Sequence, residues 1–151
     1  MLEGVVQVVC PHCDHDNRIP RERLREAPPC VACGGALFEG RPAPLDDERR
    51  FDKHVRHNDI PVLALFHAAW SADSSALHAA FERAAPQLEP YARLATVGGA
   101  ALPDLAGRLK VVRYPTLLLL HHERELARAT GAMNLAQLLA WARPRIAAVA
   151  A

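Results

Sequence analysis

The sequence predicts an α/β domain, a mixed sheet with helices on both faces, preceded by a small metal-binding module. Three observations lead to this prediction. All four cysteines lie within the first 33 residues, a segment rich in proline and glycine follows, and the rest of the chain alternates apolar runs with amphipathic stretches. At 151 residues, half of them apolar, the chain can form one ordinary domain with a small appendage.

Composition narrows the function classes. Eighteen Lys and Arg balance seventeen Asp and Glu, so no net charge attracts nucleic acid or an acidic membrane surface. The first apolar run, VVQVV, is too short for a signal peptide and lacks the basic flank of one. No run approaches the roughly 20 apolar residues of a membrane span. We therefore expect a cytoplasmic protein whose partners are neither nucleic acid nor membrane.

The cysteines form two pairs, Cys10 and Cys13 in CPHC and Cys30 and Cys33 in CVAC. The spacing C-x2-C-x16-C-x2-C is typical of a zinc site. Each pair can turn two thiolates toward one ion, and two pairs supply the four ligands of a closed tetrahedral site. Because such a site leaves no place for an activated water, we expect one Zn²⁺ with a structural role.

Two alternatives bear on this cluster. The cysteines would form two disulfides in a secreted protein, but a reducing cytoplasm disfavours disulfides. His12 and His15 could replace a ligand, but four cysteines already fill the site, so both are expected in exposed loops. Residues 1–40 hold four arginines against six acidic residues, and a zinc with four thiolates adds about two negative charges. This acidic balance argues against a ribbon that reads DNA or RNA.

The second module begins after a linker. Residues 41–48 lie in EGRPAPLDDE, whose prolines, glycine and acidic end suit a linker that runs into a helix. Phe51 and Val55, four apart among charged residues, predict an amphipathic helix. Residues 60–66, IPVLALF, form a continuous apolar run, which predicts a central strand covered on both faces.

The next elements follow the same alternation. Residues 71–88 place Leu77 and Phe81 at helical spacing, and Pro86 should kink or end this helix. The segment RLATV (93–97) predicts a strand, and a short helical stretch follows around residues 101–109.

The last third predicts a hairpin and a closing helix. VVRYPTLLLLHH (111–122) contains a buried strand, ELARATG (125–131) its neighbour, and residues 134–146 a helix with Asn134 in a capping position. The first strands of such an order are parallel and the last two antiparallel.

This order, together with PVLALFHAAW, RYPT and TGAMN, resembles thioredoxin, and the cysteine module makes it similar to the bacterial thioredoxin 2 subfamily. The resemblance covers about residues 5–148. It implies a thioredoxin fold preceded by a small zinc ribbon, with the zinc ribbon at 1–40, the linker at 41–48 and the thioredoxin-like domain at 49–151.

The resemblance fails at the redox site. Thioredoxins carry Trp-Cys-Gly-Pro-Cys where this chain reads Trp70-Ser71-Ala72-Asp73-Ser74. In such pairs the first cysteine attacks as a thiolate and the second resolves the mixed disulfide. A serine hydroxyl is barely ionised near neutral pH and cannot exchange with a disulfide. No catalytic residue is therefore expected at Ser71 and Ser74.

Neighbouring positions depart from the family as well. Leu65 stands where thioredoxins have a buried Asp, Thr96 where they have its Lys partner, and His67 where they have a Trp. An engineered Cys-to-Ser trap would have kept the acid and the lysine. These departures favour a natural redox-inactive relative, although one sequence leaves engineering open.

The family's substrate groove is partly retained. The resemblance implies a groove formed by Trp70, Tyr114, Pro115 and Thr116, in which a cis Pro115 lies beside the turn and its backbone edge pairs with an extended segment. The same residues could equally persist as scaffold, without any substrate.

New chemistry at the turn is disfavoured. Ser74 and His78 are four apart on one helix, but a serine nucleophile also needs donors for an oxyanion, for which the sequence gives no evidence. Ser71 is more simply a helix N-cap. A metal site from His67, Asp73 and His78 is disfavoured too, and His121 and His122 are expected in an exposed turn.

The leading hypothesis is a redox-inactive, zinc-binding thioredoxin 2-like protein with a protein-binding or chaperone-like role, acting through the groove, the ribbon or both. The alternative is the family's thiol–disulfide oxidoreductase activity in cell redox homeostasis, carried by the ribbon thiols or lost by engineering of the serines.

Overall fold

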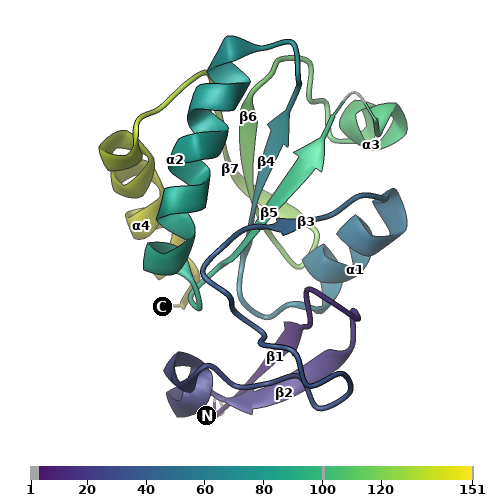
Figure 1. Ribbon diagram of the computed structural model, residues 1–151, viewed down its shortest axis with the longest axis vertical. Helices are drawn as coiled ribbons and strands as arrows, with labels where there is room; N and C mark the ends of the chain where they lie inside the picture. The colour runs from purple at the N-terminus through teal and green to yellow at the C-terminus, as the bar shows by residue number, and fades with distance from the viewer. Residues whose placement is uncertain (1–3, 100, 151) are drawn as a thin grey trace.

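The computed structural model describes residues 4–99 and 101–150, and it arranges them in two sheets with flanking helices (Figure 1). The first and last residues of the predicted modules, 1–3 and 151, lie outside this description, as does residue 100. The strands are β1 (Val5–Val9), β2 (Asp16–Pro20), β3 (Ala43–Pro44), β4 (Val62–His67), β5 (Arg93–Gly98), β6 (Thr116–His121) and β7 (Arg124–Thr130). The helices are η1 (Arg21–Glu26), α1 (Glu48–His57), α2 (Ala72–Leu88), α3 (Pro103–Arg108) and α4 (Leu135–Ala150).

The larger sheet has five strands in the order β3-β5-β4-β6-β7. Strands β3 and β4 run parallel to β5, whereas β6 is antiparallel to β4 and β7 is antiparallel to β6. The continuous apolar run of β4 lies in the middle of the sheet, as predicted, because a strand buried on both faces needs apolar side chains on both. The predicted mixed sheet is confirmed.

Helices cover both faces of this sheet (Figure 1). On one face α2 and α4 bury Leu77, Phe81 and Leu138 against β4 and its neighbours. On the other face α1 and α3 bury Phe51 and Leu105. No helix in the described part of the chain has the length and apolar character needed to cross a bilayer.

Three boundaries differ from the sequence prediction. Ala43–Pro44, inside the predicted linker, forms the edge strand β3 against β5. The strand expected within 111–122 begins only at Thr116, because Pro115 has no N–H to donate to the ladder. Helix α2 continues through Pro86 to Leu88, since a proline in the last turn removes only one helical hydrogen bond.

The N-terminal module is a β1–β2 hairpin followed by η1, and it lies below the large sheet in Figure 1. It has a small core of its own, to which Val8, Leu24 and Leu37 contribute. Ile60, from the loop before β4, joins that core, so the two modules share buried surface.

Candidate functional site

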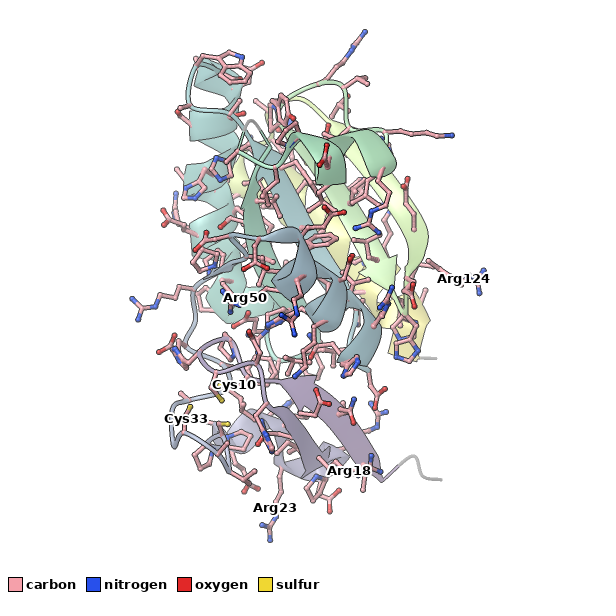
Figure 2. All side chains as sticks on the ribbon, turned by 90° about the vertical axis from the view of Figure 1, so that its right-hand side faces the viewer. Cys10, Arg18, Arg23, Cys33, Arg50 and Arg124 are labelled. Atoms are coloured by element: carbon pink, nitrogen blue, oxygen red, sulfur yellow. The ribbon has the colours of Figure 1, made fainter. Side chains whose placement is uncertain are left out.

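The four cysteines come together at one end of the ribbon (Figure 2). All four sulfur atoms lie within 4.8 Å of one another, with 3.7 Å between the Sγ atoms of Cys10 and Cys33 and 3.6 Å between those of Cys13 and Cys30. A tetrahedral ion with bonds of about 2.3 Å to sulfur places its ligands roughly 3.8 Å apart. The donor set therefore fits a metal ion, and none of the four is in a disulfide.

Backbone and side-chain N–H groups point at these sulfur atoms. The amides of His12, Ala32 and Gly35 donate to Cys10, Cys30 and Cys33 at 3.3 to 3.4 Å. The side-chain amide of Asn17 donates to Cys30 at 3.5 Å. Burial opposes ionisation of Cys30, but donors including Asn17 lower the pKa of this thiol to about 6. Such donors stabilise the thiolate form that binds metal.

The two neighbouring histidines do not join the cluster. His12 and His15 are exposed, and His12 Nε2 lies 3.3 Å from Glu39. Within residues 4–99 and 101–150, the group that could hold an ion consists of the cysteines alone.

A partly buried network of charged side chains ties the first cysteine pair to α1. Asp14, directly after Cys13, accepts hydrogen bonds from Arg50 Nε at 2.9 Å and from Arg50 Nη2 at 3.0 Å. His54 Nε2 lies 2.9 Å from the same carboxylate, and the His54 ring is fully buried. Burial opposes ionisation of Asp14, but Arg50 and His54 together lower its pKa. Burial lowers the pKa of His54 to about 4.

A second network ties the ribbon to β5. The Arg93 guanidinium is 1% exposed and donates to the carbonyl of Leu37 at 2.6 Å and to that of Val9 at 3.3 Å. It also pairs with Glu89 at 3.2 Å and lies over the Phe38 ring. Burial raises the pKa of Glu89 to about 7, although the charge of Arg93 opposes that rise.

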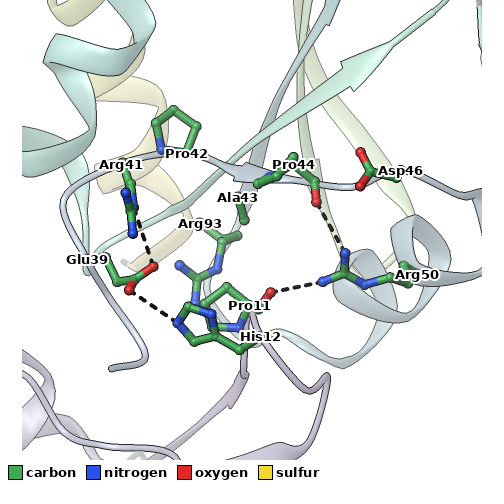
Figure 3. A pocket seen from close by; sticks show the side chains of 10 residues that line it. All are labelled: Pro11, His12, Glu39, Arg41, Pro42, Ala43, Pro44, Asp46, Arg50 and Arg93. Atoms are coloured by element: carbon green, nitrogen blue, oxygen red, sulfur yellow. Dashed lines mark hydrogen bonds and ion pairs between the residues drawn. The ribbon is translucent and has the colours of Figure 1, made fainter. Parts of the chain in front are cut away.

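A pocket of about 520 Å³ opens between the ribbon, the linker and the domain (Figure 3). Glu39 lies there between His12 and Arg41, and Arg50 donates to the carbonyls of Pro11 and Pro44. Its lining residues are Pro11, His12, Glu39, Arg41, Pro42, Ala43, Pro44, Asp46, Arg50 and Arg93. Because the first cysteine turn, the linker and α1 all contribute lining residues, this pocket lies at the joint between the modules.

The serine turn links the end of β4 to the start of α2. Ser71 is the N-cap of α2, as predicted: its Oγ accepts from the Ser74 amide at 3.1 Å. Ser71 Oγ also donates to the Tyr114 carbonyl at 3.4 Å. Ser74 is buried, and its Oγ accepts from the Ala68 amide at 3.2 Å. Both hydroxyls therefore stabilise the turn itself.

Most of the predicted groove residues gather beside this turn. The Tyr114–Pro115 peptide bond is cis, and Trp70 is 71% exposed with its ring edge-to-face against Tyr114 at 5.9 Å. Thr116 is buried, and its hydroxyl donates back to the Arg113 carbonyl at 2.7 Å. Trp70, Tyr114 and Pro115 thus surround Ser71, whereas the Thr116 side chain is used internally.

The histidines near the turn have another arrangement. The rings of His67 and His78 meet at 5.4 Å between centroids, and burial, with a smaller effect of His78, lowers the pKa of His67. Among the described residues, no hydrogen bond joins Ser71 or Ser74 to a histidine, which gives no support to a serine nucleophile.

The two histidines that were predicted in a turn, His121 and His122, both contact Asp59. His121 ends β6, and its Nε2 lies 2.8 Å from the carbonyl of Asp59. His122 follows in the turn, with its Nε2 3.2 Å from the Asp59 carboxylate.

The residues that join the two modules were not predicted from the sequence. Asp14 lies 36 residues from Arg50 and 40 from His54 in sequence, so nothing local relates it to them. Glu89 and Arg93 carry one visible signal, an opposite-charge pair four residues apart, but the pattern does not show that both are buried.

Comparisons with known proteins agree on both modules. The model of the thioredoxin family matches residues 43–144, and that of "Thioredoxin 2, N-terminal" matches residues 9–35. Thioredoxin C-3 of Corynebacterium nephridii is 33% identical over 134 residues, which cover 89% of this chain and 91% of that protein. The solved thioredoxin Mala s 13 of Malassezia sympodialis has a TM-score of 0.60 and 18% identity, covering 68% of this chain and 89% of its own, a likeness of fold.

Proposed function

This chain belongs to the thioredoxin family and carries the N-terminal ribbon of thioredoxin 2, and we propose that it is a redox-inactive, protein-binding member. The observation that carries this proposal is the pair Ser71 and Ser74 at the turn into α2. Thiol–disulfide exchange needs a thiolate that attacks and a second thiol that resolves the mixed disulfide. A serine hydroxyl can neither attack a disulfide as a thiolate does nor resolve a mixed disulfide.

The surroundings of the serines support the same proposal. Leu65 is fully buried in an apolar cluster and pairs in register with Thr96 on β5. A buried acid at Leu65 would serve proton transfer to a thiol, and without that thiol an apolar side chain avoids the cost of a buried charge. The position is thus suited to packing.

We propose that Cys10, Cys13, Cys30 and Cys33 hold one structural Zn²⁺. Four thiolates at tetrahedral separations fit this ion, and a closed site leaves no place for catalysis. When bound, the ion would cross-link the two turns of the ribbon. A reducing cytoplasm, where we expect the protein to reside, would keep the four thiols available for metal.

The binding surface we propose is the exposed surface beside the turn, where the resemblance places the family's groove. Trp70 offers a large apolar face, and the backbone around Pro115 offers an edge for an extended segment of another protein. Ribbon surfaces could add to this contact. Since no covalent step is involved, binding should depend on neither thiols nor disulfides in the partner.

Tryptophan fluorescence tests this binding. We expect a disulfide-free, extended apolar peptide to change the emission of the zinc-loaded protein saturably, with or without reductant. Trp70→Phe should remove the change, whereas Trp141→Phe, which alters the other tryptophan on α4, should keep it. Equal signals from both variants, or no saturable change in the wild type, would reject the groove as the binding surface.

One observation favours a second candidate function. Cys13 and Cys33 are exposed, so loss of the metal would leave accessible thiols. Two ribbon thiols would then be oxidised to a disulfide while a substrate disulfide is reduced to two thiols. This reductase activity should appear only after chelation of the metal.

A further inference from the structure

Two imidazole rings meet behind the serine turn. His67 ends β4 and His78 lies in the second turn of α2, and their ring centroids are 5.4 Å apart with 65° between the ring planes. Both line a cavity of about 250 Å³, together with Ala68, Ala69, Ser74 and Ser75. The structure thus brings together two of the three side chains that the sequence analysis weighed as metal ligands. Asp73, the third, is exposed and does not line the cavity.

The nitrogen atoms of this pair are available for coordination. His78 Nδ1 lies 3.8 Å from the carboxylate of Glu82, one turn along α2, which leaves Nε2 as the free nitrogen. His67 is half-buried; its carbonyl accepts from the Gly99 amide, but in the ranges 4–99 and 101–150 its ring nitrogens have no hydrogen-bond partner. A carboxylate beside the second ring nitrogen is a common way to orient a histidine that binds metal.

The separation of the rings agrees with a shared ion. Two imidazoles bound to one tetrahedral ion, with metal–nitrogen distances of about 2.1 Å, have ring centroids roughly 5 Å apart. The observed centroid separation of 5.4 Å is close to that value. The cavity beside the rings has room for the water molecules that would complete the coordination.

We propose that His67 and His78 form a second metal site, separate from the ribbon, for a divalent transition-metal ion. Imidazole nitrogen favours Ni²⁺, Cu²⁺ and Zn²⁺ over Mg²⁺ or Ca²⁺, which prefer oxygen ligands. The proposal does not depend on peptide binding at the groove.

To test this proposal, Ni²⁺ is titrated into the zinc-loaded full chain at neutral pH. Its binding is measured by calorimetry and by ¹H–¹⁵N NMR. Zinc occupies the cysteines beforehand, so Ni²⁺ reports on the remaining ligands. We expect one saturable site and paramagnetic broadening of the amide signals of Ala68, Ala69 and Ser75. His67→Gln and His78→Gln should each weaken binding by roughly tenfold or more.

The matched control is His122→Gln. It removes one histidine of another contacting pair, His121 and His122, whose Nε2 atoms are held by Asp59. Ni²⁺ binding should be unchanged in this variant. His78 is partly exposed on a helix surface, so His78→Gln should fold. If His67→Gln fails to fold, His78→Gln alone provides the test. Broadening confined to residues 121–122 or to the ribbon, or wild-type affinity in both His67 and His78 variants, would overturn the proposal.

Discussion

His54 illustrates how burial sets the behaviour of a single residue. Its ring is fully buried, and burial lowers its pKa to about 4, because Asp14 only partly offsets the desolvation and Arg93 and Arg50 add positive charge. In the unfolded chain the pKa of histidine is about 6.5. Between about pH 4 and pH 6.5, His54 is therefore protonated in the unfolded chain but neutral in the native state. The stabilising effect of a neutral His54 is complete above pH 6.5 and is lost as the pH falls toward 4.

We predict a specific loss of stability in mild acid. Between pH 7.5 and 5.5, His54 should lower the free energy of unfolding by about 1.4 kcal/mol. Urea denaturation of the zinc-loaded protein measures this, and His54→Gln should flatten the pH profile by that amount. Effects of the exposed histidines and of the metal cancel in the difference between the two proteins. Identical pH profiles would show that His54 titrates normally in the native state.

Single residues also show what could and could not be predicted from the sequence. Ser71 could be assigned as an N-cap because the signal is local, a hydroxyl directly before an amphipathic run. The buried side chains of His54 and Arg93 could not be assigned, because their partners come from distant segments of the chain. Burial of a charge is a tertiary property, and the local pattern of a charged residue is the same in solvent.

At the scale of elements, the packing of the β4–β5 pair is consistent with the proposed loss of redox chemistry. Leu65 on β4 lies opposite Thr96 on β5, and Leu65 packs against α2 and α4 in the apolar cluster. The side chains that surround Leu65 in this cluster are apolar, so the charge of an acid placed there would be buried alone. Leu65→Asp should therefore reduce the free energy of unfolding by roughly 3 kcal/mol or more.

Two further variants separate the causes. Leu65→Asn removes the same apolar contacts without a charge and should cost less at neutral pH. Leu65→Asp with Thr96→Lys should recover part of the loss, because the two positions are in register. Urea denaturation at pH 7.5 compares all three. An aspartate tolerated as well as asparagine would mean that water or a cation already reaches this part of the core.

The elements themselves were largely predictable. Long periodic or continuous apolar segments, such as those of α2 and β4, have strong local signals. The two-residue strand β3 was not predicted, because its pairing with β5 is long-range and its own sequence, Ala43–Pro44, has no strand propensity. The domain bounds at 40, 41 and 48 remain predictions, and this strand shows that part of the predicted linker takes part in the sheet.

At the scale of the whole molecule, the cysteine cluster is connected to the larger sheet and to α1 through the residues beside the cysteines. Val9, next to Cys10, accepts from Arg93 on β5, and Asp14, next to Cys13, accepts from Arg50 on α1. Removal of the metal should therefore loosen α1 as well as the ribbon. Hydrogen exchange of residues 48–57 should accelerate on chelation in the wild type.

The control for this coupling is Arg50→Met, which keeps most of the apolar stem but removes the contact to Asp14. In this variant the exchange of α1 should already be faster with zinc bound, and chelation should add little. If chelation leaves α1 exchange unchanged in the wild type, the two modules are joined in space but are energetically independent.

According to the proposed function, this thioredoxin-family chain has no disulfide reductase activity because Ser71 and Ser74 replace its redox thiols. The most direct measurement is reduction of a protein disulfide by the zinc-loaded native chain, beside a Ser71→Cys, Ser74→Cys double variant. We expect no turnover by the native chain, and activity in the variant would show that the serines alone account for the loss. Activity that appears only after chelation would belong to Cys10, Cys13, Cys30 and Cys33, whereas turnover by the zinc-loaded native chain would contradict the proposal.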